Sequence, residues 1–264
     1  MFDAGFSIAP DFRTMAFVYG EDAFGPVTEK RFLNDIRASL RDPDCIGPDL
    51  LYSVAMDVGK RQHLRDLQSR NLLYGAMIYA GGRLGQEPVR SQGHAHAVSA
   101  SCGTSTPEVY EIWDGSAAIY MQERNEDDAG DCFVVYASSG DVIIVPEGWV
   151  HCTINASDSQ EMTFGAWCVR DYGFDYTGVR AHGGVAFFPY FGAAGQLLWK
   201  KNPRYTHAKL HHMWTPDYSS LDIAKGIPIY TQYENNPGLF DFVTHPAQFP
   251  EKTKQYLPNG GQLK

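Results

Sequence analysis

From Leu72 onward the sequence is a succession of short apolar runs separated by glycine and acidic turns. Runs of this length and composition, bounded by turn residues, are typical of β-strands. They predict strands over residues 73–79, 89–96, 109–113, 117–122, 131–137, 141–145, 150–154 and 162–169. Many short strands at this spacing indicate a sandwich or barrel, so the centre of the chain is expected to be all-β.

The segment before this region has a helical texture. Thr28 is a suitable N-cap for a helix that carries Phe32, Ile36 and Leu40 at four-residue steps. That helix is expected to end before Pro43, because the residue ahead of a proline avoids the helical conformation. A second helix is expected over residues 60–71.

These patterns divide one domain into three parts. Residues 1–71 are expected to form an N-terminal strand and helix segment that packs on the barrel. The barrel, with the functional site, is expected over residues 72–192. Residues 193–264 are rich in Pro, Asn and Tyr towards their end and are expected to be an irregular C-terminal extension of the same domain.

Composition excludes several classes of function. The formal net charge is −9, which argues against binding to nucleic acid, although a small phosphorylated substrate is compatible with a local pocket. No apolar run reaches the length of a membrane span, and the N-terminus lacks a signal peptide pattern. The five cysteines are odd in number and scattered, which suits a reducing compartment. We therefore expect a cytoplasmic protein.

Three histidines and one glutamate stand out as candidate metal ligands. His94 and His96 are separated by one residue, so on a strand they point to the same face. A turn at residues 146–148 folds His151 back towards this pair. Strand alternation places Glu108 and Tyr110 on one face and Glu111 on the other. Imidazoles and a carboxylate together suit a divalent first-row transition metal.

These residues resemble the two motifs of the cupin superfamily. Gly140, Pro146, Gly148, His151 and Asn155 match the pattern G-x5-P-x-G-x2-H-x3-N at every spacing. The first motif, G-x5-H-x-H-x3,4-E-x6-G, is matched by His94, His96, Glu108 and Gly115, but with a longer gap from His96 to Glu108 and without its first glycine. The resemblance implies a jelly-roll-like cupin β-barrel, here with N-terminal helices and a C-terminal extension.

Within the cupins, residues 72–185 are similar to the cupin-type glucose-6-phosphate isomerases. The wording LLYGAMIYAGGRLGQEPVRSQGHAH, PEVYEIWDGSAAIYMQ, VPEGWVHCTIN and FDYTGVRAHGG carries this similarity. It implies a metal-dependent interconversion of glucose 6-phosphate and fructose 6-phosphate. It further implies one divalent metal per chain, Fe2+ first with Mn2+, Ni2+ or Zn2+ as alternatives, and a homodimer. The implied ligands are His94, His96, Glu108 and His151.

The same resemblance implies the contacts with substrate. Ser91, Gly93, Tyr110 and Tyr176 stand at positions that bind substrate in the family, with Ser91 and the Gly93 N–H near the phosphate. Glu108 is expected to be catalytic, and His182 is a further candidate for the chemistry.

One expected phosphate contact is replaced in this sequence. Ala76 and Met77 stand where the family often has a hydroxyl, so one phosphate donor is expected to be missing. Arg83 or Arg90 is the expected substitute.

Other functions share the same ligand set. A related isomerase acting on mannose 6-phosphate, a metal-dependent cupin dioxygenase and a non-catalytic sugar-binding cupin all remain open on the sequence. For the isomerase, both proton transfer through an enediolate and a direct hydride shift are compatible with these residues.

Overall fold

A computed structural model describes residues 3–257, and most of its regular structure is β-strand. The strands are β1 (Ile8–Asp11), β2 (Ala16–Tyr19), β3 (Ala23–Phe24), β4 (Glu29–Phe32), β5 (Leu50–Met56), β6 (Gly59–Lys60), β7 (Leu72–Tyr79), β8 (Arg83–Leu84), β9 (Glu87–Pro88), β10 (Ala95–His96), β11 (Glu108–Asp114), β12 (Ser116–Gln122), β13 (Asp128–Ser138), β14 (Val142–Val145), β15 (Val150–Asn155), β16 (Met162–Val169), β17 (Phe174–Asp175), β18 (Phe187–Phe191), β19 (Leu197–Lys201) and β20 (His207–Trp214).

The helices are short. The α-helices are α1 (Leu33–Ile36), α2 (Leu64–Ser69), α3 (Thr177–Ala181), α4 (Ile229–Asn235), α5 (Asp241–Thr244) and α6 (Pro250–Thr253). Single 3-10 turns are η1 (Arg37–Ser39), η2 (Arg61–His63), η3 (Ser219–Leu221), η4 (Pro237–Phe240) and η5 (Pro246–Gln248). Within residues 3–257, no helix has the length and apolar character needed to cross a bilayer.

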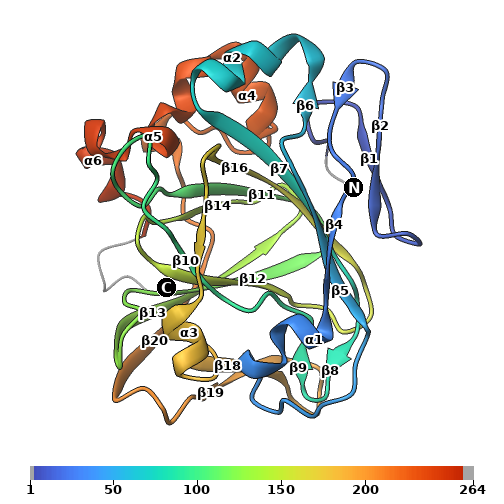
Figure 1. Ribbon diagram of the computed structural model, residues 1–264, viewed down its shortest axis with the longest axis vertical. Coiled ribbons are helices and arrows are strands. Elements are labelled where there is room, and N and C mark those ends of the chain that lie inside the picture. The colour runs from blue at the N-terminus through green and yellow to red at the C-terminus, as the bar shows by residue number, and fades with distance from the viewer. Residues whose placement is uncertain (1–2, 258–264) are drawn as a thin grey trace.

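Two sheets form the body of the molecule (Figure 1). The larger sheet has the order β14-β11-β16-β7-β5-β4, and the smaller sheet has the order β15-β12-β13-β20. Every pairing inside them is antiparallel except that of β13 with β20. Side chains from the facing surfaces of both sheets share one apolar core, which includes Met77 and Phe164 from the larger sheet and Ile119 from the smaller. This confirms the all-β, jelly-roll-like architecture expected from the sequence.

The larger sheet is covered on both faces, which explains the composition of its central strand. All eight residues of β7 are buried. Leu73, Met77 and Tyr79 pack between the sheets, whereas Tyr74 and Ile78 pack into a second core on the outer face. A strand buried on both sides shows no polar alternation, so β7 appears in the sequence as one continuous apolar run.

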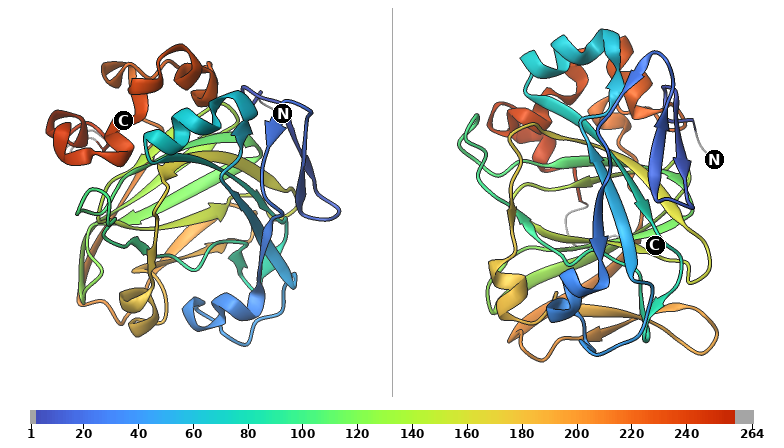
Figure 2. Two further views of the ribbon diagram at one scale, coloured as in Figure 1. Left: turned by 45° about the horizontal axis from the view of Figure 1, so that its top comes forward. Right: turned by 45° about the vertical axis from the view of Figure 1, so that its right-hand side comes forward.

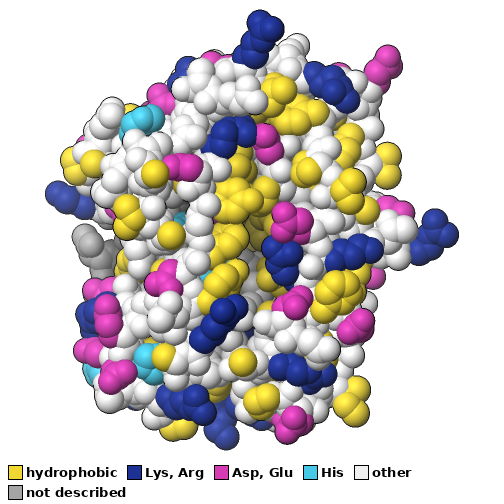
Figure 3. All heavy atoms as spheres, in the orientation of Figure 1, with side chains coloured by type: hydrophobic (Ala, Val, Ile, Leu, Met, Phe, Trp, Pro, Cys, Tyr) yellow, Lys and Arg dark blue, Asp and Glu magenta, His cyan; other side chains and the backbone are white. Residues whose placement is uncertain are grey.

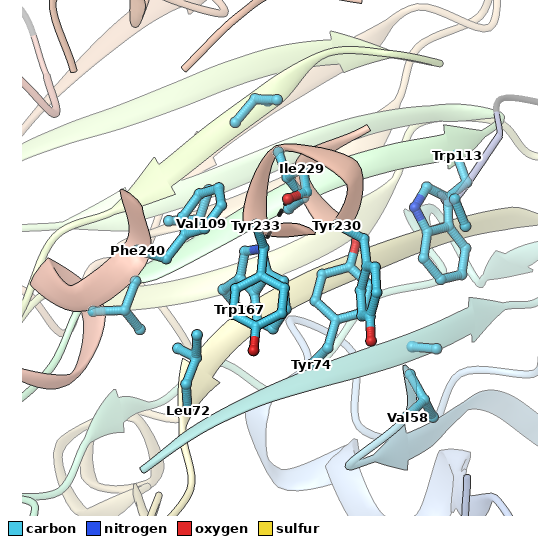
Figure 4. Packing of buried hydrophobic residues seen from close by; sticks show 14 of the residues in the cluster. Val58, Leu72, Tyr74, Val109, Trp113, Trp167, Ile229, Tyr230, Tyr233 and Phe240 are labelled. Atoms are coloured by element: carbon cyan, nitrogen blue, oxygen red, sulfur yellow. Dashed lines mark hydrogen bonds between the residues drawn. The ribbon is translucent and has the colours of Figure 1, made fainter. Parts of the chain in front are cut away.

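The C-terminal helices cover the outer face of the larger sheet. Figures 1 and 2 place α2, α4, α5 and α6 together on that side of the molecule. Figure 4 shows Tyr230 and Tyr233 of α4 beside Tyr74 and Trp167 of the sheet. The Trp167 and Tyr230 rings are stacked with centroids 5.4 Å apart, and Trp167 is fully buried. Aromatic burial of this extent fixes the extension on the sheet.

The two sheets cross the boundaries expected after residues 71 and 192. The segment 1–71 contributes β4 and β5 to the larger sheet, and β20 of the segment 193–264 pairs with β13 of the smaller sheet. The barrel therefore extends beyond residues 72–192 on both sides. These strands were missed because their pairing partners lie far away in the sequence.

Two local predictions also need correction. The helix expected after Thr28 is wrong in its first turn, because residues 29–32 form β4 against β5, and the helical part is limited to α1 and the 3-10 turn η1. The strand expected over residues 89–96 is reduced to Ala95–His96, with single bridges from Arg90 and His94 to β15. By contrast, the second expected helix is present as η2 and α2.

Glu111 is the one carboxylate of β11 that lies under the C-terminal helices. Its side chain is fully buried, and it accepts hydrogen bonds from the N–H of Ile229 (2.9 Å) and from Trp113 Nε1 (3.3 Å). Burial raises the pKa of Glu111 to about 8, which the two hydrogen bonds only partly oppose. The carboxyl is therefore protonated in the folded protein at neutral pH.

This burial predicts an unusual dependence of stability on pH. Below pH ~4.5 the carboxyl is neutral in both states, while between ~4.5 and ~8 only the unfolded chain ionises it. The free energy of unfolding should therefore decline through that window by an amount on the order of a few kcal/mol. Glu111→Gln keeps an acceptor for Ile229 and should abolish this part of the decline.

Thermal melts from pH 5 to pH 8 measure the effect. The melting temperature of the wild type should fall more than that of Glu111→Gln. An identical decline in both proteins would show that Glu111 does not carry the buried proton.

Candidate metal centre

Two of the predicted ligands are held opposite one another by their own backbones. His94 and His151 form an isolated antiparallel bridge, in which the N–H of His94 donates to the carbonyl of His151 (3.1 Å) and the N–H of His151 donates back (2.9 Å). Residues directly opposite in such a bridge carry their side chains on the same face. The two imidazole rings accordingly lie with centroids 4.3 Å apart.

His96 joins this pair because it lies two residues after His94. β10 carries it and pairs with β17, where His96 is opposite Phe174. Its ring centroid lies 5.5 Å from that of His94 and 4.8 Å from that of His151. One potential ligand atom from each of the three histidines lies within 4.8 Å of the others.

The imidazoles are oriented through their Nδ1 atoms. His96 Nδ1 lies 2.7 Å from the carbonyl oxygen of Thr106, and His151 Nδ1 lies 3.4 Å from that of Trp149. A proton on Nδ1 that donates to a carbonyl leaves the lone pair of Nε2 free. Carbonyl contacts of this kind commonly fix the tautomer and the ring plane of metal-binding histidines.

Glu108 completes the group as the first residue of β11. Its Oε1 lies 3.3 Å from His96 Nε2, and its Oε2 lies 3.7 Å from His151 Nε2. Tyr110, two residues further along the same face, donates to Glu108 Oε2 at 2.5 Å. The alternation of β11 therefore brings Glu108 and Tyr110 into the site and sends Glu111 to the opposite face of the sheet.

The long gap between His96 and Glu108 is folded into a loop that supports the site. Asp171 accepts hydrogen bonds from the Ser101 N–H (2.9 Å) and from the Ser99 hydroxyl (2.9 Å). The Ser105 hydroxyl accepts from the N–H of Gly148 (2.9 Å), in the turn that precedes His151. The eleven residues 97–107 therefore leave Glu108 in place and tie together the two halves of the site.

Burial sets the charge of the site. It lowers the pKa of His94 well below the usual value and lowers that of His151 to about 4. Burial also raises the pKa of Glu108, but the neighbouring His96 charge and hydrogen bonds outweigh it, so the pKa of Glu108 lies below its usual range. At neutral pH His94 and His151 are thus neutral beside an ionised Glu108, as metal binding requires. Burial also acts to lower the pKa of His96, but the charge of Glu108 and its hydrogen bond outweigh burial and raise it.

The donor set fits a divalent metal ion. The Nε2 atoms of His94, His96 and His151 are buried and make no hydrogen bond with any part of the chain between residues 3 and 257. An unpaired buried polar atom costs free energy, and three of them facing one carboxylate call for a common partner. Three nitrogens and a carboxylate oxygen suit a first-row transition metal that keeps further positions for substrate.

The metal centre lies at the inner end of a cavity between the two sheets, which His94 and Glu108 line. Apolar and aromatic side chains form most of its wall, among them Met77, Phe164 and Tyr52. Figure 3 shows the face of the molecule on which a hollowed hydrophobic seam runs between β4 and β10, with Lys and Arg side chains on either side. A mostly apolar wall with a few polar groups is typical of a site for a small molecule.

The structure brings some of the predicted substrate contacts to this cavity. Ser91, Tyr110 and Tyr176 line it. The Ser91 hydroxyl already accepts a hydrogen bond from the Thr153 N–H (3.0 Å) deep in the wall. Gly93 has φ +91°, and a Cβ there would meet Val185 at 2.8 Å, so the need for glycine comes from packing behind the site.

His182 lies elsewhere, and its predicted role needs correction. Its Nδ1 contacts the Gly178 carbonyl (2.7 Å), its Nε2 contacts Asp127 (3.0 Å), and its ring stacks on Tyr205. Among the described residues it is not part of the cavity wall. With both ring nitrogens engaged, His182 anchors the end of α3.

The two arginines expected to replace a phosphate donor are engaged away from the cavity. Arg83 pairs with Asp158 on the surface. Arg90 is completely buried, with Nε 2.8 Å from Glu87 and a second nitrogen 2.6 Å from the Ser39 carbonyl. Met77 does line the cavity, whereas Ala76 belongs to the core on the opposite face of the sheet.

Sequence reasoning missed the part of the wall supplied by β4 and β5. Arg31 and Tyr52 lie at the mouth of the cavity, and neither strand was predicted. The run Leu50–Met56 is apolar apart from Ser53 and ends before an acidic residue and a glycine, which is the local sequence signal for this strand.

Metal content tests the centre directly. His96→Ala and His151→Ala should each weaken binding of Fe2+ or Mn2+ by more than about a hundredfold, since each removes one of few ligands. Elemental analysis after loading and gel filtration gives the metal per chain. The matched control is His211→Ala, which removes a histidine of β20 that contacts Asp131 instead. A full complement of metal in folded His151→Ala would contradict the site.

A family model described as glucose-6-phosphate isomerase matches residues 33–207 of the chain. This region contains all four residues of the metal centre. No curated protein matches the chain.

Solved structures show only distant likeness. They include an oxalate oxidase (12% identity, TM-score 0.35, 48% of this chain and 55% of that chain), the oxalate decarboxylase of Bacillus subtilis (16%, 0.32, 60% and 32%) and a vicilin from Capsicum annuum (9%, 0.34, 47% and 30%). The chain thus spans between 30% and 55% of the length of these proteins.

Proposed function

The chain belongs to the glucose-6-phosphate isomerase family, and on that premise we propose that it interconverts glucose 6-phosphate and fructose 6-phosphate in the cavity between its two sheets. The family match covers residues 33–207, which includes the metal centre and most of the cavity wall. The reaction moves hydrogen between C1 and C2 of the open-chain sugar.

One observation carries the proposal: three imidazoles and one carboxylate meet at the inner end of a cavity that suits a small polar molecule. An aldose–ketose isomerase needs a group that polarises the C1 and C2 oxygens and a carboxylate beside them. Among the described residues lining the cavity, the carboxylates are Glu108 at the inner end and Glu29 at the mouth. Glu108 is the one beside the histidines.

We propose His94, His96, His151 and Glu108 as the ligands of one divalent metal per chain, with Fe2+ as the first choice and Mn2+, Ni2+ or Zn2+ as alternatives. When bound, such an ion supplies Lewis acidity that polarises the carbonyl oxygen of the sugar. The support comes from the unpaired Nε2 atoms and the neutral state of His94 and His151.

The chain itself orients the carboxylate. Tyr110 holds Oε2 of Glu108, which leaves Oε1 as the atom to take a proton from C2 and return it to C1. The lowered pKa of Glu108 makes it a weak base, so a hydride shift past an ionised Glu108 fits the same geometry. Deuterium from D2O enters the product only by the proton route.

The setting of the enzyme is also part of the proposal. We place it in the cytoplasm, because its five cysteines are free thiols. A homodimer is proposed from the family resemblance of the sequence.

A coupled assay with fructose 6-phosphate tests the function. The purified protein should lose activity when a chelator removes the metal and regain it with at least one of Fe2+, Mn2+, Ni2+ or Zn2+, because Glu108 alone does not polarise the sugar. Mannose 6-phosphate is measured in parallel as the nearest alternative substrate. Absence of turnover with fructose 6-phosphate under all four metals would refute the proposed reaction.

Two glutamates on one strand provide a matched pair of variants. Glu108→Gln should lower kcat by a factor on the order of 10²–10⁴, the usual size of an acid–base contribution. Glu111→Gln lies three residues away on the opposite face and should leave kcat within about twofold, since it touches no part of the cavity. Equal losses in both variants would mean that the effect comes from the stability of β11.

A further inference from the structure

We propose that Arg31 and Arg180 clamp the phosphate group of the substrate at the mouth of the cavity. This proposal rests on the isomerase function above and names the residues that make it specific for a phosphorylated sugar. Neither arginine was identified from the sequence, and Arg31 lies just before the region that the family model matches.

The clamp lies at the outer end of the same cavity. A second hollow opens at the surface, and it shares Arg31, Tyr52, Gln92 and Tyr176 with the cavity that leads to the metal centre. Arg180 lines the outer hollow. A substrate whose C1 end reaches the histidines therefore extends its far end towards the two arginines.

The mouth is the place where positive charge is available. Among the described residues that line the inner cavity, Arg31 is the only lysine or arginine. The outer hollow adds Lys30 and Arg180. A phosphate monoester carries close to two negative charges at neutral pH, and guanidinium groups bind such oxygens through paired hydrogen bonds.

Arg180 is held in position before any ligand arrives. Its guanidinium lies 4.8 Å from the centroid of the Tyr176 ring. In the amide orientation that satisfies its hydrogen bonds, the buried Gln92 accepts from Arg180 Nε at 3.2 Å and donates to the Asp35 carbonyl. These contacts engage one face of the guanidinium and its Nε. No residue between 3 and 257 is hydrogen-bonded to the terminal nitrogens of Arg180, so both are available to an anion.

Arg31, on the edge strand β4, lines both hollows together with Tyr176. Burial raises the pKa of Tyr176, and the positive charges of Arg31 and Arg180 act against it. Arg31 Nη2 pairs with Glu29 at 2.8 Å, and this pair is largely open to solvent. An exposed pair of this kind is weak, so an incoming dianion competes well with Glu29.

The interior offers little to replace this clamp. Met77 presents a thioether where the family often has a hydroxyl, and the Ser91 hydroxyl, which accepts from the Thr153 N–H, has one O–H donor. Arg83 and Arg90 are bound elsewhere. The phosphate contact missing from the wall is therefore supplied from β4 and α3.

The test compares a phosphorylated with an unphosphorylated inhibitor. Sorbitol 6-phosphate and sorbitol share an open carbon chain that cannot isomerise. Arg31→Gln and Arg180→Gln should each raise the inhibition constant of sorbitol 6-phosphate about tenfold, as expected for loss of a charge-assisted contact, and leave that of sorbitol within about twofold. Arg83→Gln removes a surface arginine outside both hollows and should change neither constant.

Glu29→Gln separates binding from a structural effect. It removes the carboxylate that competes for Arg31 and should lower the inhibition constant of sorbitol 6-phosphate about twofold. If Glu29→Gln raises the inhibition constant of sorbitol 6-phosphate as much as Arg31→Gln does, the ion pair acts structurally. That result would overturn the proposal. Equal changes for both inhibitors in the arginine variants, or no change for either, would also overturn it.

Calorimetric titration with inorganic phosphate distinguishes this proposal from the isomerase function. If the wild type binds phosphate but shows no turnover, and the arginine variants lose this binding, the clamp is supported and the reaction is refuted. Normal isomerisation with unchanged phosphate affinity in those variants refutes the clamp alone.

Discussion

The antiparallel bridge between His94 and His151 is the interaction on which the rest of the site depends. Its two backbone hydrogen bonds join the segment just before β10 to the start of β15, and they bring two imidazoles together in an edge-to-face arrangement. His96 follows by strand alternation, and Glu108 enters from the neighbouring strand of the larger sheet. A site assembled from two sheets in this way exists only when the whole body of the protein has folded.

Burial on both faces of the larger sheet provides the rigidity that this assembly needs. The C-terminal helices and their aromatic residues press on the outer face, while the core between the sheets supports the inner face. Glu111 shows the energetic consequence, because the same strand that presents Glu108 to the cavity must bury a second carboxyl on its other side. The strand alternation that builds the site thus also introduces a pH-dependent weakness in the fold.

The sequence allowed the metal centre to be predicted more fully than the cavity mouth. The spacing of His94 and His96, the turn before His151 and the alternation around Glu108 are all short-range signals, and the four side chains do come together. Arg31 was missed because the four-residue spacing of Phe32, Ile36 and Leu40 predicted a helix from Thr28 onward. The strand conformation of residues 29–32 depends instead on pairing with β5, some twenty residues away. His182 was misassigned because its distance along the chain from Tyr176 says nothing of Asp127, which takes its Nε2.

X-ray absorption spectroscopy of the metal-loaded protein is the most direct test of the central claim, that the three Nε2 atoms and Glu108 share one cation. The account predicts a first shell of nitrogen and oxygen only, with the multiple-scattering signature of three imidazoles. A shell that contains sulfur from Cys168, which lines the same cavity, or that lacks imidazole, would contradict it.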